Sequence, residues 1–229
     1  MTDAPAPEPG RFDLTTPLGR AVTYADYLWN DHAYLRLGFS NAHWISEELV
    51  RANQPWPHQL AAWKARGIRT VVNLRGGFDA SFHALEKDAC ARLGLTFVNF
   101  TITSREVPSR ERVLAAKRLF ETLEYPALMH CKSGADRAGI MSVLYLHFRK
   151  GLPIRAALDQ LSFRYLHIRH GKTGVLDYTF ARYLTEGEPA GMSFLEWVQS
   201  PLYDPAGIKA DFRTNMWANA LTEGVLRRE

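Results

Sequence analysis

The chain has 229 residues, of which 46% are hydrophobic and 23% charged, the proportions of an ordinary globular protein. This length suits one sizeable domain with additions and is short for two. The formal net charge of +4 fits anionic partners but is too small for a typical nucleic-acid-binding domain, so no nucleic-acid partner is predicted.

The N-terminal segment, residues 1–32, begins with MTDAPAPEPG, which is rich in proline and lacks the apolar stretch of a secretory signal. We expect a disordered or extended tail there. No stretch of the chain approaches the ~20 apolar residues that cross a bilayer. The two cysteines, Cys90 and Cys131, occur in different contexts, which favours a reducing compartment over a disulfide framework. These features predict a cytoplasmic protein.

Residues 33–185 alternate between short segments typical of strands and longer segments typical of helices. The expected strands are rich in β-branched, aromatic or apolar residues, the first two forming a hairpin, and lie at 34–39, 43–50, 68–77, 95–102 and 127–131. The expected helices show helical spacing of apolar residues, and lie at 57–67, 82–94, 109–125, 137–150, 153–166 and 174–184. This alternation predicts an α/β fold with a central, mostly parallel twisted sheet flanked by helices. Residues 186–229 are expected to form a helical extension that packs on the domain or is partly ordered.

The sequence HCKSGADRAG, residues 130–139, lies where the last expected strand ends and a helix begins. A polar, glycine-punctuated turn between a strand and a helix can direct backbone N–H groups and the positive end of the helix at one anion. Arg137, six residues after Cys131, can offer two parallel hydrogen bonds to phosphate oxygens. The same positive field stabilises a thiolate at Cys131, which is then a nucleophile for phosphorus. A buried free cysteine is the plainer interpretation, but His130, the glycines and Arg137 together favour a phosphate loop.

This stretch resembles the H-C-x5-R signature of the cysteine-dependent phosphatases, in the compact dual-specificity-like and bacterial tyrosine-phosphatase branch. The segment RANQP, followed by a helix and VVNLRGG, is similar to the opening of bacterial members of that branch. The resemblance covers roughly Trp44 to Leu166. It implies a cysteine-phosphatase fold over the domain at 33–185, a two-step reaction through a phosphocysteine, and no metal or other cofactor.

The resemblance also implies roles for the loop residues. Cys131 would be the nucleophile, Arg137 the phosphate clamp, and His130 a support for the thiolate. The phosphate would be cradled by the loop backbone, to which we assign Lys132, Ser133, Gly134, Ala135 and Gly139.

Two positions depart from the pattern of that family. The residue after the loop arginine is usually Ser or Thr, whose hydroxyl helps the thiolate leave during hydrolysis of the phosphoenzyme, but here it is Ala138. The usual upstream aspartate, which protonates the leaving group, is also missing, because no Asp occurs between Cys90 and Gly134.

The candidate general acids are therefore carboxylates in other places. Asp136 ranks first, because C-x4-D-R resembles phosphoinositide phosphatases of the myotubularin and Sac-type families, in which an in-loop Asp can serve as acid. Glu106, in the preceding loop, is the alternative, and Asp79 is a distant third. Two of them have a plainer interpretation, since Asp136 can bond loop amides or a neighbouring cation and Glu106 can be a solvated loop charge.

Three cationic features could extend the phosphate site. Lys132 is predicted to meet a second phosphate or an acidic head group, or else to be a solvated lysine. Arg75, at the end of an expected strand, is assigned to the mouth of the site, or else fixes a neighbouring carboxylate. The most basic stretch predicts an electropositive rim for a polyanionic head group or an anionic membrane, with an ordinary basic loop as the alternative; it contains Arg164, His167, Arg169, His170 and Lys172.

The loop therefore predicts an enzyme, a cysteine-dependent phosphatase acting on phosphate monoesters and most similar to the dual-specificity and tyrosine phosphatases. Its predicted partner is a phosphorylated protein. The alternative is a phospholipid or inositol phosphate, with peripheral contact with an anionic membrane. An alternative of another class is a phosphate-binding pseudo-phosphatase, supported only by Ala138 and the missing upstream Asp.

Overall fold

The structure is a computed structural model that describes residues 12–214. Contacts divide the chain into two compact units. Unit 1 comprises Met1–Thr101 and Glu124–Lys132, and unit 2 comprises Ile102–Leu123 and Ser133–Glu229.

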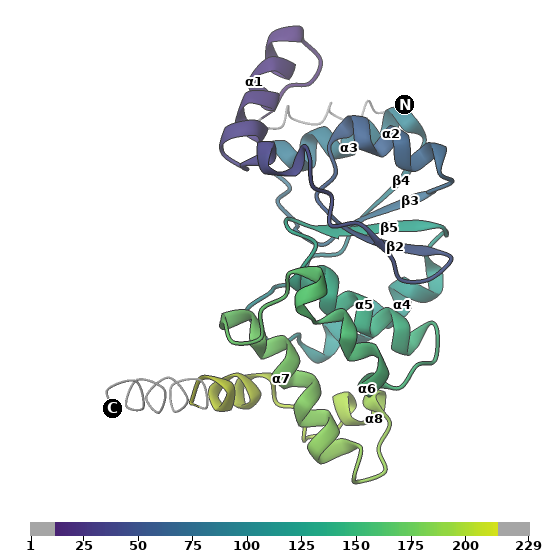
Figure 1. The fold of residues 1–229 in the computed structure, drawn as a ribbon, viewed down its shortest axis with the longest axis vertical. Coiled ribbons are helices and arrows are strands. Elements are labelled where there is room, and N and C mark those ends of the chain that lie inside the picture. The colour runs from purple at the N-terminus through teal and green to yellow at the C-terminus, as the bar shows by residue number, and fades with distance from the viewer. Residues whose placement is uncertain (1–11, 215–229) are drawn as a thin grey trace, which may run out of the picture. The chain divides into compact units, whose positions relative to one another are not determined.

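Unit 1 contains a five-stranded sheet whose strands follow the order β1-β2-β5-β3-β4 (Figure 1). The β1–β2 pair is antiparallel, and every other pair in the sheet is parallel. Each residue of β2, β3 and β5 is buried, as expected for strands in the interior of a mostly parallel sheet. The central position belongs to β5, the strand that ends at Cys131. The strands are β1 (His43–Trp44), β2 (Leu49–Asn53), β3 (Thr70–Asn73), β4 (Thr96–Asn99) and β5 (Ala127–Cys131).

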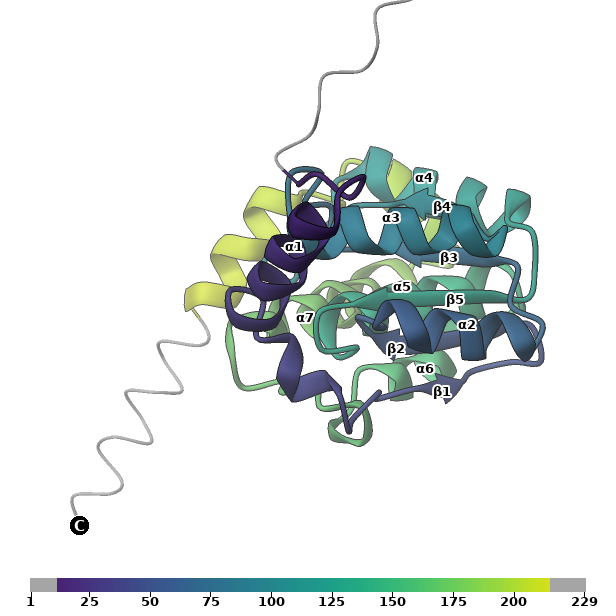
Figure 2. The same cartoon turned by 90° about the horizontal axis from the view of Figure 1, so that it is seen from above.

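Two helices of unit 1, α2 (Pro57–Ala65) and α3 (Ser81–Leu93), lie side by side along the sheet (Figure 2). Pro57 occupies the first turn of α2, where its missing N–H costs nothing, and Gly94 closes α3 in the left-handed conformation at φ 63°. The core beneath them joins side chains from strands and helices, including Val50, Leu60, Ile68, Val71, Cys90 and Leu128.

The expectation of a disordered or extended tail over residues 1–32 is wrong for part of that segment. Pro17–Trp29 forms helix α1, which is capped by the Thr16 side chain and buries Tyr27 against Trp56 at 4.8 Å between ring centroids. The first expected strand also differs, since Ala33–Arg36 is a short 3-10 helix. The aromatic residues near the end of α1 provide the apolar contacts that stabilise this region, and a composition-based prediction does not weigh them.

Unit 2 is helical and is organised around α5 (Asp136–Phe148), in which every residue from 138 to 146 is buried. Helix α4 (Arg110–Thr122) packs on it through Phe120 and Tyr145, whose ring centroids are 5.4 Å apart. The remaining α-helices are α6 (Ile154–Ala157), α7 (Val175–Arg182) and α8 (Phe194–Gln199), followed by a helix over 205–214. The helix expected at 153–166 is broken, because α6 gives way to 3-10 turns at Leu158–Gln160 and Phe163–Tyr165.

The region after residue 185 packs through an aromatic cluster of unit 2. Phe194 and Trp197 of α8 contact Phe180 and Tyr183, and the buried Tyr203 hydroxyl donates to the Pro108 carbonyl at 2.6 Å. The expected helical extension therefore contains helices at Phe194–Gln199 and 205–214, and its last part, 215–229, lies outside the described residues. No helix over 12–214 is long and apolar enough to span a membrane. The predicted α/β class with a mostly parallel sheet is confirmed.

Truncation of Leu128, in the middle of β5, tests how much the burial of this strand contributes to the stability of the protein. Its side chain is fully buried in the unit 1 core, so Leu128→Ala is expected to lower the free energy of unfolding by about 3 kcal/mol in urea titrations. The control is Leu35→Ala, which removes the same atoms from an exposed side chain and should change stability by less than about 0.5 kcal/mol. Equal losses for the two variants would contradict this assignment of the core.

Candidate active site

Cys131 is the last residue of β5, at the carboxyl edge of the parallel sheet. It is a free thiol and 1% exposed. The preceding His130 is fully buried, and its Nε2 lies 2.6 Å from Oε1 of Glu86 on α3. Ligands of parallel α/β sheets bind beyond this edge, so the fold gives Cys131 the position that the sequence predicted for a reactive residue.

A buried carboxylate, Asp31, gathers three cations at the same edge of unit 1. Arg75 donates two hydrogen bonds to its oxygens at 2.5 and 3.0 Å, Arg36 donates another, and Lys132 Nζ lies 3.4 Å away. Burial alone would raise the pKa of Asp31, but the hydrogen bond and charge of Arg75, with the charges of Arg36 and Lys132, outweigh it and lower the pKa. The carboxylate therefore stays ionised and holds these cations in place.

Two residues assigned to substrate binding take part in this network. Arg75 is 7% exposed, donates to Gln54 Oε1 at 3.0 Å and stacks over the Phe82 ring at 3.5 Å. This geometry matches the plainer interpretation, in which Arg75 fixes a neighbouring carboxylate. Lys132 keeps a side chain that is 43% exposed. Asp31 itself was missed by sequence reasoning, because it lies in the segment that was expected to be a tail.

The phosphate-loop residues that belong to unit 2 lead directly into α5. Gly134 adopts φ 75°, a left-handed conformation that favours glycine, and the Ser133 hydroxyl accepts a hydrogen bond from the Ala135 N–H at 3.4 Å. The Gly139 N–H bonds the Ala135 carbonyl at 2.8 Å, so it is used within the helix and is not available to a phosphate.

Arg137 lies in the first turn of α5 and is partly exposed. Its guanidinium has no hydrogen bond or ion pair with any residue that the structure describes. A guanidinium without a protein partner at the N-terminus of a helix can still make its planar, two-pronged contact with an oxyanion.

His167 is buried between two carboxylates of unit 2. Its Nδ1 lies 2.8 Å from Asp136 Oδ1 and its Nε2 lies 2.5 Å from Asp177 Oδ2. Burial would lower the pKa of the imidazole, but the hydrogen bonds and charges of Asp136 and Asp177 raise it to about 9. His167 is therefore a cation at neutral pH that links the start of α5 to α7.

Two central residues of the predicted basic rim are not free, exposed cations in the structure. His167 is 2% exposed, and Arg169 pairs with Asp177 at 3.0 Å. Acidic partners in unit 2 thus neutralise part of the stretch. Sequence reasoning missed Asp136 as a partner because it lies 31 residues before His167, and missed Asp177 because it was expected within the next helix. His170 and Lys172 remain exposed.

The two leading candidate acids differ in how their oxygens are used. Asp136 is 25% exposed and uses Oδ1 for His167, while Oδ2 has no hydrogen-bond partner within 12–214. Both carboxylate oxygens of Glu106 accept from Lys209. Asp79, the third candidate, is an exposed residue of unit 1. The hydroxyl missing at Ala138 is not replaced by Ser142, which donates to the Ala138 carbonyl at 2.7 Å.

Comparisons with known proteins identify the class. The family model described as a DSP-PTPase phosphatase fused to NAD+ kinase matches residues 44–172, more than half of the chain. The protein is a cysteine-dependent phosphatase of the dual-specificity-like branch. It belongs to this DSP-PTPase family, as the loop signature predicted.

Several solved structures are similar to this chain. Tk-PTP in its active form is 25% identical over 52% of this chain and 81% of its own, with a TM-score of 0.45. TpbA of P. aeruginosa is 19% identical over 61% and 88%, with a TM-score of 0.48, and PTPMT1 is 15% identical over 65% and 99%, with a TM-score of 0.48. No curated protein matches the chain significantly.

The raised pKa of His167 predicts a pH-dependent contribution to stability. Because the pKa of about 9 in the folded protein exceeds the ordinary histidine pKa of 6.5, the contribution is complete below pH 6.5 and is lost as pH rises through about 9. Wild type should exceed His167→Gln in the free energy of unfolding by roughly 3 kcal/mol at pH 6, and much less at pH 10. Urea titrations at pH 6, 7.5, 9 and 10 measure the difference.

The control is the same substitution at His170, which is exposed and should give only a small difference in the free energy of unfolding. A difference between wild type and His167→Gln that stays constant from pH 6 to 10 would show that His167 is not a cation in the folded protein.

Proposed function

We propose that Cys131 is the nucleophile of this phosphatase. Its thiolate attacks the phosphorus of a phosphate monoester, so that the S–P bond forms while the bond from phosphorus to the ester oxygen breaks. A general acid gives a proton to the leaving oxygen. Water then attacks the phosphocysteine, releasing inorganic phosphate and restoring the thiolate. The C-x5-R loop at the end of the central strand carries this proposal.

Arg137 is the proposed phosphate clamp. This proposal is supported by the guanidinium of Arg137, which forms no hydrogen bond or ion pair with a described residue. By contrast, Arg75 and Arg36 form ion pairs with Asp31. The loop N–H groups after Cys131 and the N-terminus of α5 would add further donors to the phosphate oxygens. Lys132, Ser133, Gly134 and Ala135 remain the proposed backbone cradle.

Asp136 is the proposed general acid. Its Oδ2 has no hydrogen-bond partner in the described chain, so a proton carried on this oxygen is available to the leaving group, while the contact between Oδ1 and His167 holds the carboxyl group in place. Glu106, the alternative, is bonded through both oxygens to Lys209 and would have to break that ion pair before donating.

The proposed substrate is a phosphorylated protein, handled as by dual-specificity phosphatases. The features that favoured a lipid head group are partly compensated within each unit, because Lys132 is near Asp31 and Arg169 pairs with Asp177. A phosphoinositide remains the second candidate, favoured by the Asp136–Arg137 pair and the exposed Lys172, and it would require peripheral contact with an anionic membrane. A cytoplasmic location is supported by two buried free thiols, Cys90 and Cys131.

Replacement of the nucleophile tests the reaction and the substrate together. Cys131→Ser should reduce phosphate release by at least ~10⁴-fold on every substrate, because a hydroxyl at this position has no base that would activate it. Wild type should release phosphate from a phosphotyrosine peptide at least ~10-fold faster than from a soluble phosphoinositide at equal concentration. The reverse ratio would select the lipid substrate, and full turnover by Cys131→Ser would exclude the thiolate mechanism.

Leaving-group dependence tests the acid. Asp136→Asn should slow hydrolysis of an alkyl phosphate by ~10²-fold or more, because an alkoxide needs the proton, but should slow p-nitrophenyl phosphate less than ~10-fold. Glu106→Gln is the matched control and should change both rates less than ~3-fold. Equal losses of Asp136→Asn on both substrates would make Asp136 structural, and a leaving-group-dependent loss in Glu106→Gln would transfer the role to Glu106.

A further inference from the structure

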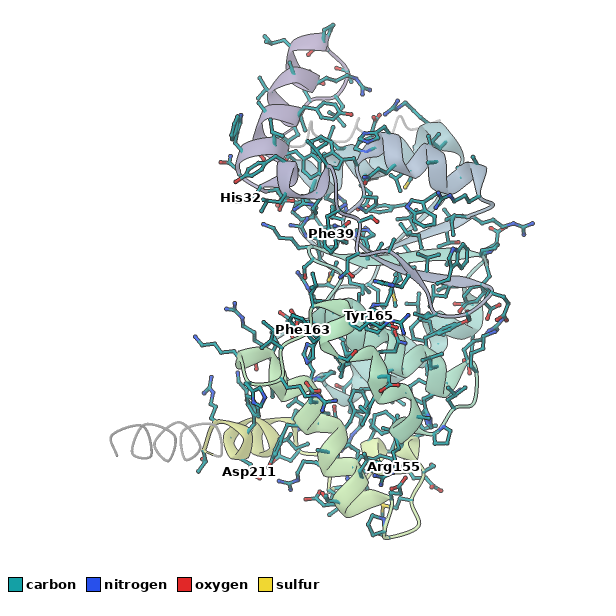
Figure 3. All side chains as sticks on the ribbon, in the orientation of Figure 1. His32, Phe39, Arg155, Phe163, Tyr165 and Asp211 are labelled. Carbon is teal, nitrogen blue, oxygen red and sulfur yellow. The ribbon has the colours of Figure 1, made fainter. Side chains whose placement is uncertain are left out.

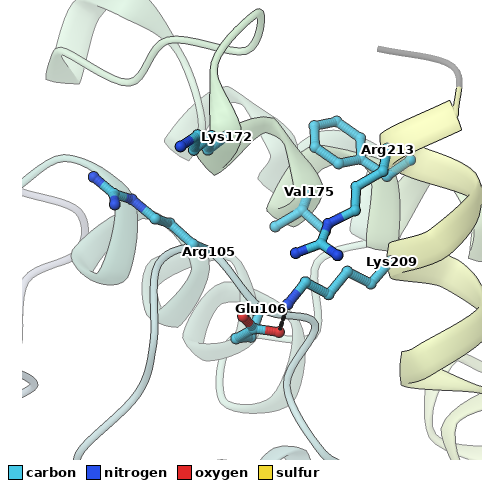
Figure 4. Close-up of a pocket in the computed structure, with 7 residues that line it drawn as sticks. Arg105, Glu106, Lys172, Val175, Lys209 and Arg213 are labelled. Atoms are coloured by element: carbon cyan, nitrogen blue, oxygen red, sulfur yellow. Dashed lines mark hydrogen bonds and ion pairs between the residues drawn. The ribbon is translucent and has the colours of Figure 1, made fainter. Parts of the chain in front are cut away.

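A second, strongly cationic cavity lies within unit 2 (Figure 4). Its volume is about 440 Å³, which is in the range of small-molecule sites. The lining contains neither Cys131 nor Arg137, and consists of Arg105, Glu106, Lys172, Val175, Lys209, Phe212 and Arg213. The cavity therefore shares no residue with the phosphate loop.

The charges around this cavity do not balance. Four cations face a single carboxylate, Glu106, which is bonded to Lys209. The side chains of Arg105, Lys172 and Arg213 form no ion pair or hydrogen bond with any other residue between 12 and 214. Like charges gathered around one cavity repel one another, and an anion that enters it relieves this repulsion.

The cations reach the cavity from three different segments. Figure 4 shows Lys209 and Arg213 extending from the helix over 205–214 toward the loop that carries Arg105 and Glu106, with Lys172 on a third segment. Groups that converge from separate segments can contact several faces of one ligand, whereas cations along one helix present only a charged stripe.

The helix over 205–214 is held against unit 2 by contacts outside the cavity. Asp211, labelled in Figure 3, pairs with Arg182 at 2.5 Å, and the ring centroid of Phe212 lies 5.8 Å from that of Tyr178. Both partners belong to α7. The cations of this helix therefore project from an anchored element, and their positions do not depend on the ion pair inside the cavity.

The lining also contains an apolar part. Val175, at the start of α7, is buried, and Phe212 is partly exposed. Guanidinium groups favour phosphate oxygens, because they donate paired hydrogen bonds in one plane, and the apolar side chains can cover a hydrocarbon or ring portion.

We propose that this cavity is a second anion site, which binds an organic phosphate bearing more than one negative charge. Arg105, Lys172 and Arg213 contact the phosphate oxygens, and Val175 with Phe212 contacts the organic part. Four of the lining residues lie beyond the segment 44–172 that the family model matches, namely Val175, Lys209, Phe212 and Arg213. The site is thus an addition of this chain's C-terminal helix to the phosphatase domain.

The test is a binding titration with inositol 1,4,5-trisphosphate, using the full chain with Arg137→Ala so that the phosphate loop lacks its clamp. Binding should persist in this background and weaken at least ~10-fold when Arg105→Glu and Arg213→Glu are added. The control is Arg118→Glu, which makes the same charge change on the exposed face of α4 and should alter the dissociation constant less than ~2-fold. Thermal melts establish that each variant is folded.

If the double variant melts early, the single neutral change Arg213→Gln replaces it, with an expected weakening of at least ~3-fold. Equal weakening by Arg118→Glu, or undiminished binding by the pocket variants, would overturn the site. Vesicles of phosphatidylcholine containing a phosphoinositide identify the source of the ligand, since pocket-dependent capture of these vesicles indicates a lipid head group and its absence indicates a soluble phosphate. Turnover by Cys131 is measured separately, so failure here leaves the proposed reaction intact.

Discussion

The start of α5 depends on one buried charge, the imidazolium of His167. Two carboxylates, Asp136 and Asp177, enclose it and keep it protonated at neutral pH, because their combined attraction exceeds the cost of burying the ring. Asp136 and Arg137 are consecutive, so the contact between His167 and Asp136 also restricts the backbone conformation of Arg137. A phosphate site needs donors held in place before the anion arrives, and the His167 network supplies that order without using Arg137 itself.

Unit 1 also contains a buried charge that holds its neighbours in place, but there the central charge is negative. There a carboxylate, Asp31, lies among cations, and it holds Arg75, Arg36 and Lys132 near the carboxyl edge of the sheet. An ion pair that is 7–9% exposed is little screened by solvent, so removing Asp31 would leave uncompensated positive charges. The role of Arg75 is thus to order the sheet edge. The paired side chain of Lys132 is still 43% exposed and can reach solvent.

The sequence alone predicted the strands at 68–77, 95–102 and 127–131, the mostly parallel sheet and the turn from β5 into α5, because these depend on local patterns. The apolar run before Cys131 is typical of a buried strand, and the glycines after it are typical of a turn. What could not be predicted were partnerships between residues far apart in the sequence. Asp31 is 44 residues from Arg75, and His167 is 31 from Asp136. Composition also hid helix α1, since the acidic, proline-rich beginning dominated the interpretation of residues 1–32.

Charge compensation gives a physical criterion for which cations can serve a ligand. A basic residue that already has a buried acidic partner can bind an anion only by giving up that contact, as Arg75 and Arg169 would have to do. A cation without such a partner has no contact to lose, and Arg137, Arg105 and Arg213 are among the described residues that meet this condition. The first belongs to the phosphate loop and the other two to the unit 2 cavity. Counting basic residues along the chain predicted a rim at 164–172. In the folded protein acidic side chains pair with His167 and Arg169 of that stretch, whereas Lys172 lines the unit 2 cavity together with Arg105 and Arg213.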